Sequence, residues 1–564
     1  MKSSTITTLY AVLVSLVRAS PLGAVGLSEG TTAVTQPAVT FIGSLVNDVE
    51  YYRGIPYAQP PTGNLRLRPP KPVENVGIID ATGIGPACPQ FTTAGSSPVL
   101  NRVVGVPGVA EGLFFASAQG NETEDCLTLS VMRPGNTQPD EKLPVLFWIH
   151  GGAFQTGSAQ PFNASVLVPR GVSQDKPFIL VATNYRLGGF GFLGGKEILE
   201  DGAANLGLLD QRMALEWVAD NIASFGGDPN AVTIWGESAG ARSVFDQLAL
   251  YDGDNTHKGR PLFRAAIMNS GSLAPAEPVD GPRAQNIFDT VVDAAGCGAV
   301  PSSEKLDCLR GLDVETFANA TTQVPSYLSY NNLALSYAPR PDGRTLTASP
   351  ETLAQEKKFA AVPMIIGTQE NEGTVFGVWP YNVTTRAEAI SYLSDVYFPD
   401  ASLEQISHLV DLYTPCTVES TVTTSVNETY PEFKRLSAIF GDYEFTLIGR
   451  VLLDLTNENE LSWSYLATYG RDTPIVGTYH TEDLPRMFAK TDDSSRAIQD
   501  RFISFLYHLD PNGALADRTS PRWPSWQESR ELFEFGASSV GVLDGDFRDN
   551  IFQYIRDNLN EFRH

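Results

Sequence analysis

A serine in the middle of this sequence stands among small residues, in a setting that can make it a nucleophile. The segment Gly-Glu-Ser-Ala-Gly at positions 236–240 follows an apolar run that ends at Trp235, and it precedes a predicted helix. A tight strand-to-helix turn of this kind exposes a serine hydroxyl, and it needs glycine where a side chain would meet adjacent backbone. Free N–H groups at a helix start also favour developing negative charge. We expect Ser238 to be the nucleophile of an acyl transfer, rather than part of a glycine-rich turn without chemistry.

A second run of small residues at positions 151–153 directly follows the apolar run 145–149. Such residues let backbone N–H groups approach a substrate oxygen, and a tetrahedral intermediate needs two or three donors, each worth about 3 kcal/mol of the barrier. We expect the donors to be the N–H groups of Gly152, Ala153 and Ala239; the alternative is a purely structural turn. We expect the preceding His150 to shape this loop rather than to act as a base.

A serine nucleophile needs a base, and histidine is the usual one near neutral pH. In enzymes built around this type of turn the chain order is serine, acid, histidine, so the base lies downstream. The downstream histidines with enough separation are His408, His480, His508 and His564. The first falls in an amphipathic helical pattern, the third follows an apolar run, and the last ends the sequence. We expect the base to be His480, which follows a loop-like segment beyond the apolar run 463–466.

The acid that orients the histidine should follow a strand and precede His480. Glu372 fits, because the segment Asn-Glu-Gly-Thr at positions 371–374 comes just after the apolar run 364–366. Its carboxylate would hold the imidazole tautomer and stabilise the imidazolium without taking the proton. Glu370 is the nearby competitor, and a solvated surface glutamate is the alternative without a function.

The elements that must position these residues are visible as short apolar runs, each with the length of a buried parallel strand. The runs cover residues 145–149, 178–182, 232–235, 265–268, 364–366 and 463–466. Helical patterns lie between them, for example over residues 209–222. Strands that alternate with helices predict an α/β fold with a mainly parallel sheet covered on both faces. No linker separates independent units, so we expect one large domain with insertions over residues 20–564.

The composition excludes some classes of partner. The chain has 564 residues and a formal net charge of −25. Nucleic acids and anionic membranes repel a polyanion, so we expect no nucleic-acid partner. No spacing of cysteine and histidine resembles a zinc site, and serine chemistry calls for no metal or organic cofactor.

The N-terminus has the pattern of an export signal. Lys2 precedes an apolar stretch from Ile6 to Val17, and small residues suit a cut after Ala19. A transmembrane anchor is the alternative, but the stretch is shorter than the ~20 residues that span a bilayer. We therefore expect a signal peptide at residues 1–19, a secreted extracellular protein and no stable membrane insertion.

Modification sites agree with an oxidising compartment. Possible N-glycosylation sites in Asn-x-Ser/Thr triplets are Asn121, Asn163, Asn319, Asn382 and Asn427. The chain has 5 cysteines, an odd number. The shortest separation joins Cys297 to Cys308, and Cys88 with Cys126 is the next local pair, which leaves Cys416 over.

Several segments together resemble one known family, the type-B carboxylesterases and lipases, which includes cholinesterases and secreted fungal lipases. The resemblance extends from about Val34 to the region of Trp523, and segments 251–255 and 340–343 look most like the secreted fungal lipases. The segments that carry it are Gly-Glu-Ser-Ala-Gly-Ala at 236–241, Gly-Gly-Ala-Phe at 151–154, Glu-Asp-Cys-Leu at 124–127, Tyr-Arg-Gly-Ile-Pro-Tyr-Ala at 52–58 and Asn-Glu-Gly-Thr at 371–374.

The resemblance implies an α/β-hydrolase fold and a triad of Ser238, Glu372 and His480, with glutamate in place of the commoner aspartate. It also implies the disulfides Cys88–Cys126 and Cys297–Cys308, and structural ion pairs Arg53–Glu124 and Arg186–Asp210. His150 departs from close fungal lipases, which often carry a different residue there.

The implied activity is hydrolysis of carboxylic esters, as in a lipase acting on acylglycerols or other fatty-acyl esters. A carboxylesterase acting on small dissolved esters, a non-catalytic adhesion protein on the same scaffold and a serine peptidase are the rivals. The intact set of Ser238, Glu372 and His480 argues against the adhesion protein.

The segment between Cys88 and Cys126 is relevant to the choice between lipase and carboxylesterase. It is strongly apolar and could be a lid over the active site; a packed surface loop is the alternative. Its apolar residues are Val99, Leu100, Val103, Val104, Val106, Val109, Leu113, Phe114 and Phe115.

Overall fold

The structure is a computed structural model that describes residues 30–74, 76–91, 95–118, 120–414, 429–456, 460–513 and 520–564. The expected signal peptide, Cys416 and Asn427 lie outside the described residues.

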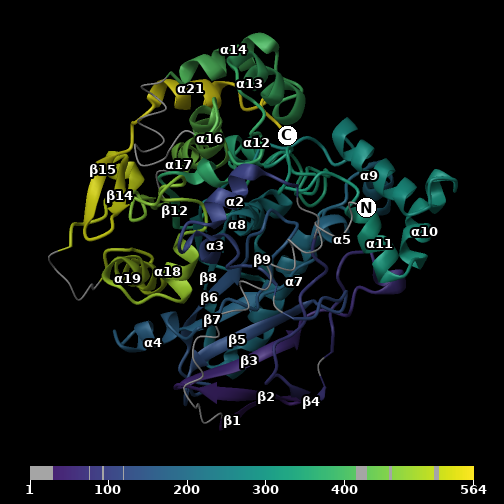
Figure 1. Ribbon diagram of the computed structural model, residues 1–564. Helices are drawn as coiled ribbons and strands as arrows, with labels where there is room; N and C mark the ends of the chain where they lie inside the picture. Colours follow the sequence, from purple (N-terminus) through teal and green to yellow (C-terminus); the bar gives the residue numbers. More distant parts are fainter. Residues whose placement is uncertain are drawn as a thin grey trace.

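The described strands form a 13-stranded sheet in the order β1-β2-β3-β5-β7-β6-β8-β11-β12-β13-β14-β15, with β4 paired to β2, and a separate hairpin of β9 and β10. Figure 1 shows the first strands at the bottom of the molecule and the yellow strands β14 and β15 at its left edge. The bounds are β1 (Gly30–Thr35), β2 (Val39–Val46), β3 (Val49–Pro56), β4 (Gly77–Asp80), β5 (Thr128–Pro134), β6 (Leu143–Ile149), β7 (Ile179–Thr183), β8 (Gly227–Glu237), β9 (Thr256–His257), β10 (Arg260–Pro261), β11 (Ala265–Asn269), β12 (Met364–Gln369), β13 (Ser462–Ala467), β14 (Glu531–Phe535) and β15 (Val540–Asp544).

The centre of the sheet is parallel from β7 through β6, β8, β11, β12 and β13 to β14. Antiparallel pairing appears where β5 meets β7 and where β15 meets β14. The six predicted apolar runs correspond to β6, β7, β8, β11, β12 and β13, which confirms the α/β fold with a mainly parallel sheet. These central strands are apolar at successive positions because both faces of the sheet are covered.

Strand β6 shows how the two faces are filled. Val145, Phe147 and Ile149 belong to one hydrophobic core, and Leu146 and Trp148 belong to another on the opposite face. The first core includes residues of α7 and α8, and the second includes residues of α4, α18 and α19. The helix predicted at residues 209–222 is α7 (Leu206–Asn221).

Other helices lie around the sheet, with α9, α10 and α11 at one side of Figure 1 and α13, α14 and α16 at the top. The bounds are α2 (Pro98–Val104), α3 (Val109–Leu113), α4 (Leu167–Val172), α5 (Gly188–Gly191), α6 (Lys196–Asp201), α8 (Ala239–Ala249), α9 (Pro282–Ala294), α10 (Lys305–Gly311), α11 (Val314–Thr321), α12 (Pro350–Gln355), α13 (Arg386–Tyr392), α14 (Leu403–Leu412), α16 (Phe433–Gly441), α17 (Leu447–Leu455), α18 (Asp483–Phe488), α19 (Asp493–His508), α20 (Trp526–Ser529) and α21 (Asp549–Asp557).

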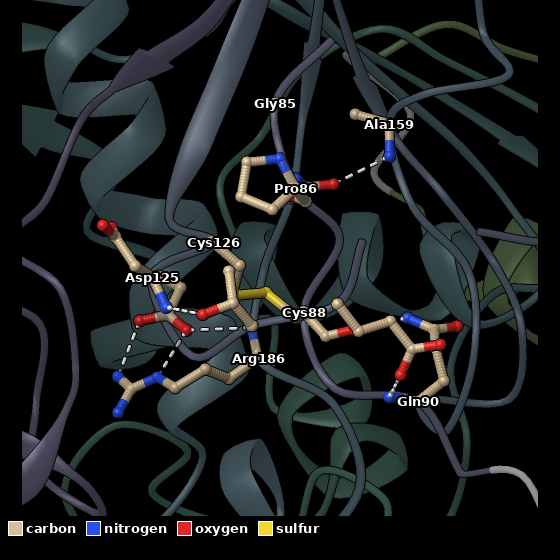
Figure 2. Close-up of a disulfide and its surroundings, with 12 residues drawn as sticks. Gly85, Pro86, Cys88, Gln90, Asp125, Cys126, Ala159 and Arg186 are labelled. Carbon is tan, nitrogen blue, oxygen red and sulfur yellow. Dashed lines mark hydrogen bonds and ion pairs between the residues drawn. A yellow bond between two sulfur atoms is a disulfide. The ribbon is translucent and has the colours of Figure 1, made fainter. Parts of the chain in front are cut away.

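Two disulfides join Cys88 to Cys126 and Cys297 to Cys308. Figure 2 shows the first of them, with Gln90 and Asp125 on the two segments that it joins. The bridge closes the segment that contains α2 and α3, so both ends of this apolar segment are tied to one point of the fold.

Of the two ion pairs implied by the resemblance, Arg186–Asp210 is present and buried, at 2.7 Å. Glu124, the expected partner of Arg53, binds the guanidinium of Arg66 through two hydrogen bonds of 2.6 and 2.7 Å. Strand β3 changes register between Tyr52 and Ile55, and the guanidinium of Arg53 lies 4.3 Å from the ring centre of Tyr51. Arg66, by contrast, follows the short 3-10 turn η1 (Gly63–Leu65) and enters the core.

Candidate active site

Ser238 occupies the turn between β8 and α8, with φ 58° and ψ −123°. A residue other than glycine rarely adopts a positive φ, and backbone strain of this type clusters at functional sites. Two glycines make the turn sterically feasible. A Cβ at Gly236 would lie 2.3 Å from the carbonyl carbon of Gly240, and a Cβ at Gly240 would lie 2.1 Å from the oxygen of Ile149. The strand-turn-helix context predicted for this serine is therefore present.

Ser238, His480 and Glu372 form one continuous chain of hydrogen bonds. The hydroxyl of Ser238 lies 2.9 Å from Nε2 of His480, and Nδ1 of His480 lies 2.6 Å from Oε2 of Glu372. The other carboxylate oxygen of Glu372 accepts the N–H of Gln369 at 2.7 Å. Glu372 and His480 are buried, whereas Ser238 is partly exposed. This arrangement lets the imidazole accept the serine proton while the carboxylate holds the opposite ring nitrogen.

The loops that carry Glu372 and His480 are joined by backbone pairing. Both follow neighbouring parallel strands, β12 and β13, and the N–H of Asn371 donates to the carbonyl of Thr478 at 2.8 Å. The N–H of Thr478 in turn donates to the side-chain oxygen of Asn371 at 3.0 Å. Gly477 has φ 64°, and a Cβ there would lie 2.0 Å from that same oxygen. The spacing of acid and base is therefore fixed by the loops themselves.

The competing candidates lie elsewhere. Glu370 forms a surface ion pair with Arg471 at 2.6 Å. His508 is exposed at the end of α19, and His408 is exposed on α14 with its ring against Tyr554. His564 is buried beside Glu444, at 3.7 Å.

The loop after β6 turns sharply next to the serine. Gly152 and Ala153 have φ angles of 106° and 56°, and a Cβ at Gly152 would lie 2.2 Å from the carbonyl oxygen of Thr156. Ala239 is the first residue of α8, so its N–H has no acceptor within the helix. A Cβ at Gly151 would lie 3.0 Å from Cβ of Ser238, which shows how closely the loop approaches the nucleophile.

His150 lies under this loop. Its Nδ1 is 2.9 Å from the carbonyl oxygen of Gly151, and its ring stacks on Tyr185 with centroids 4.4 Å apart. Burial lowers the pKa of His150 to about 4, so the ring is neutral near pH 7. Its position is consistent with the expected role in shaping the loop.

Two further buried carboxyl groups, which the sequence reasoning missed, lie beside the imidazole. Glu237 Oε1 is 3.4 Å from Nε2 of His480, and burial, reinforced by the charges of Asp483 and Glu372, raises the pKa of Glu237 well above its usual value. Burial also raises the pKa of Asp483 to about 6, although Asn269 donates a hydrogen bond to it at 2.8 Å. Two features of the sequence could have pointed to them, because Glu237 directly precedes Ser238 and Asp483 lies three residues after His480.

The segment closed by Cys88–Cys126 packs on the residue that precedes His480. Val99, Val103 and Val109 are buried. The hydroxyl of Tyr479 donates to the carbonyl of Gly108 at 3.3 Å, and a Cβ at Gly112 would lie 2.3 Å from that hydroxyl. The apolar side of α2 and α3 therefore faces the protein rather than water.

Other expectations concern the surface. Asn121, Asn163, Asn319 and Asn382 are all exposed. Within the described ranges no helix has the length and apolar character needed to cross a membrane. The same part of the chain contains no cluster of three or more His, Cys, Asp or Glu side chains that could hold a metal ion.

Comparisons with known proteins agree with this geometry. A family model described as the carboxylesterase family matches residues 38–547. A secreted triacylglycerol lipase of Gibberella zeae is 47% identical over 93% of this chain and 90% of its own length. Secreted lipase 1 of Botryotinia fuckeliana is 46% identical, over 94% of this chain and 93% of its own length.

Solved structures show the same fold. EstA of Aspergillus niger superposes with a TM-score of 0.78 and 26% identity, over 94% of this chain and 99% of its own. A PNB esterase superposes with a TM-score of 0.71 and 27% identity, over 93% of this chain and 99% of its own.

Proposed function

The chain belongs to the carboxylesterase family and is a carboxylic ester hydrolase, and from this premise we propose that it is a secreted lipase that cleaves fatty-acyl esters such as acylglycerols through Ser238. The observation that carries the proposal is the continuous hydrogen-bonded chain from Ser238 through His480 to Glu372. A non-catalytic adhesion protein does not need these hydrogen bonds, and an adhesion role would not maintain the strained backbone of Ser238 after β8.

The reaction has two steps. His480 takes the proton of Ser238 as Oγ attacks the ester carbonyl, and the resulting oxyanion binds the N–H groups of Gly152, Ala153 and Ala239. The tetrahedral intermediate collapses, His480 gives the proton to the leaving alcohol, and the acyl group stays on Oγ. Water then repeats the sequence, releases the acid and restores the serine. Glu372 keeps the proton on Nδ1, so that Nε2 is free to accept.

Lipid substrates are favoured by the segment between Cys88 and Cys126. Its apolar residues pack inward beside Tyr479, next to the proposed base. In water, a lid of this kind would stay closed and keep its apolar residues buried, because burying apolar area is worth roughly 25 cal/mol per Å². At a lipid surface it would open, and the same residues would contact lipid. The two relatives named as secreted lipases support this choice and also support secretion after removal of residues 1–19.

A carboxylesterase for small dissolved esters is the second candidate, and the similarity to solved PNB esterases favours it. Hydrolysis rates across p-nitrophenyl esters of rising chain length, set beside an emulsified triglyceride, separate the two. A lipase hydrolyses the emulsion and prefers the longer esters, whereas a carboxylesterase loses activity as the chain lengthens. The Ser238→Ala variant is the control in both assays and should lose turnover by several orders of magnitude while keeping its fold.

A further inference from the structure

Two phenylalanine rings pack against the ring of His480. The centroid of Phe445 lies 4.6 Å from that of the imidazole, and the centroid of Phe376 lies 5.1 Å away. The two phenyl rings stack on each other at 5.7 Å, and both are buried. Phe376 comes four residues after Glu372, but Phe445 comes from a separate element. The hydrogen bonds of the imidazole lie in its plane, so contacts with neighbouring rings are what resist tilting out of that plane.

Phe445 lies in an unusual element, the π-helical turn η7 (Asp442–Thr446) between α16 and α17. A π-helical turn contains one residue more than an α-helical turn, and such turns occur frequently at functional sites. In an α-helix each residue advances by about 100° around the axis, so the extra residue changes which side chains face inward. Here Asp442, Tyr443, Glu444 and Phe445 are all buried.

Two buried ion pairs restrain this turn, one at its first residue and one at its middle residue. Asp442 binds Arg548 at 2.6 Å and accepts the hydroxyl of Tyr413 at 3.0 Å. Glu444 binds Arg242 at 2.5 Å. A buried carboxylate without its cation is strongly disfavoured, so each pair restrains the backbone that carries it.

Arg242 connects the turn to the nucleophile. It stands one turn after Ser238 on α8, and its N–H donates to the carbonyl of Ser238 at 3.0 Å. Its guanidinium lies 5.9 Å from the centre of the Phe445 ring. The buried Arg242–Glu444 ion pair therefore links α8, which follows Ser238, to the turn that carries Phe445.

We propose that Phe445 is a positioning residue for His480, and that the Arg242–Glu444 ion pair holds the π-helical turn so that the phenyl ring stays against the imidazole. The proposal rests on the proposed role of His480. Its consequence differs between the two steps of the reaction. Before acylation the serine hydroxyl and Glu372 both hold the imidazole in place. In the acyl-enzyme, Oγ is an ester oxygen without a proton, so the serine no longer donates a hydrogen bond to the imidazole, and the orientation of the base toward water depends more strongly on Glu372 and the aromatic rings.

The test is stopped-flow hydrolysis of a dissolved p-nitrophenyl ester, in which the burst reports acylation and the steady state reports deacylation. Misplacing a reacting group by an ångström can cost about 100-fold, so we expect Phe445→Leu to slow deacylation by roughly tenfold or more and acylation by less than about threefold. The matched control is Phe440→Leu on α16, which is equally buried and packs on Tyr392 and Tyr397. The control should lower the melting temperature similarly and leave both rate constants nearly unchanged. Phe445→Met, which fills the same space with a flexible chain, provides a second variant if the leucine variant folds poorly.

The ion pair is tested in a double-mutant cycle. Glu444→Gln should slow deacylation in the wild-type background and have much less effect in the Phe445→Leu background, because residues that act through one another are not additive. Equal effects in both backgrounds would show that the pair does not act through the ring. Wild-type deacylation in both Phe445 variants, with Ser238→Ala inactive, would overturn the positioning role alone. Turnover by Ser238→Ala would instead overturn the proposed function.

Discussion

Replacing Glu372 with glutamine removes the charge of the acid and leaves its size nearly unchanged. The structure shows why glutamine cannot substitute. One carboxylate oxygen is 2.6 Å from Nδ1 of His480, and the other accepts the N–H of Gln369 at 2.7 Å. Both positions require an acceptor, and glutamine has only one acceptor oxygen and one NH₂ group. If the NH₂ group faces the imidazole, Nδ1 must lose its proton and Nε2 must carry it, which is the wrong tautomer for accepting the serine proton.

If the NH₂ group instead faces the N–H of Gln369, these two donors face each other in a buried site. The imidazole then keeps its tautomer, but it loses the carboxylate charge that stabilises the imidazolium. The same exchange of acid for amide in the serine proteases lowers kcat by about 10⁴, which corresponds to roughly 5 kcal/mol of transition-state stabilisation. We expect a loss of kcat/KM between about 10³-fold and 10⁴-fold for Glu372→Gln.

The assay is hydrolysis of a dissolved p-nitrophenyl ester near pH 7, with near-ultraviolet circular dichroism as the check on folding. Glu370→Gln is the matched control, because it makes the same chemical change two residues away and breaks only the surface pair with Arg471. Surface pairs contribute about 0–1 kcal/mol, so this control should change kcat/KM by less than about threefold. A loss below about tenfold for Glu372→Gln, or equal losses at both positions, would refute the assignment of the acid.

Three further predictions concern the base, the lid and the interior. His480→Ala should match the loss caused by Ser238→Ala, whereas His508→Ala, at an exposed helix end, should keep most activity; an essential His508 in the same ester assay would contradict the choice of base. Catalysis should rise sharply when a short-chain ester passes its solubility limit, and changing Phe114 and Phe115 to Ser should blunt that rise more than it slows hydrolysis of dissolved ester; a smooth saturation curve would favour a packed loop. Burial raises the pKa of Asp246 to about 8 from 3.8, so the folded state holds a proton that the unfolded chain releases, and stability falls as pH rises between these values. Asp246→Asn should therefore raise the melting temperature by about 2 °C or more at about pH 9 and by clearly less at about pH 5, where only a small part of the interval between the two pKa values has been crossed; a gain of equal size at both pH values would contradict the cause.

The central sheet could be predicted because its strands are buried on both faces, so that apolar residues follow one another without a regular polar alternation. Strand β6 is the clearest case, since Leu146 and Phe147 point to different cores yet are both apolar. The first strands were missed for the opposite reason. In β1, exposed and buried residues mix over six positions, and the signal of a short edge strand is weak.

The three side chains that meet at the candidate site could be chosen from their order and their place after strands. What could not be predicted depends on contacts between distant parts of the chain. Glu124 is bound by Arg66, which lies 58 positions before it in the chain, and no local pattern marks these two residues as partners. The contact of Phe445 with His480 depends on one extra residue in a helical turn, and no local pattern in the sequence marks where a helix gains that residue.

The order of strands in the sheet also has a consequence for how this chain acquires activity. The catalytic candidates follow three different strands: Ser238 follows β8, Glu372 follows β12 and His480 follows β13. In the sheet, β11 separates β8 from β12, and β13 lies next to β12. The hydrogen bonds of the site join residues 242 and 108 positions apart in the chain. Contacts this distant form slowly, because long loops must close before the contacts stabilise them. Ester hydrolysis should therefore return late during refolding, after fluorescence from the buried tryptophans, and the specific activity of a preparation measures how much of it has completed its sheet.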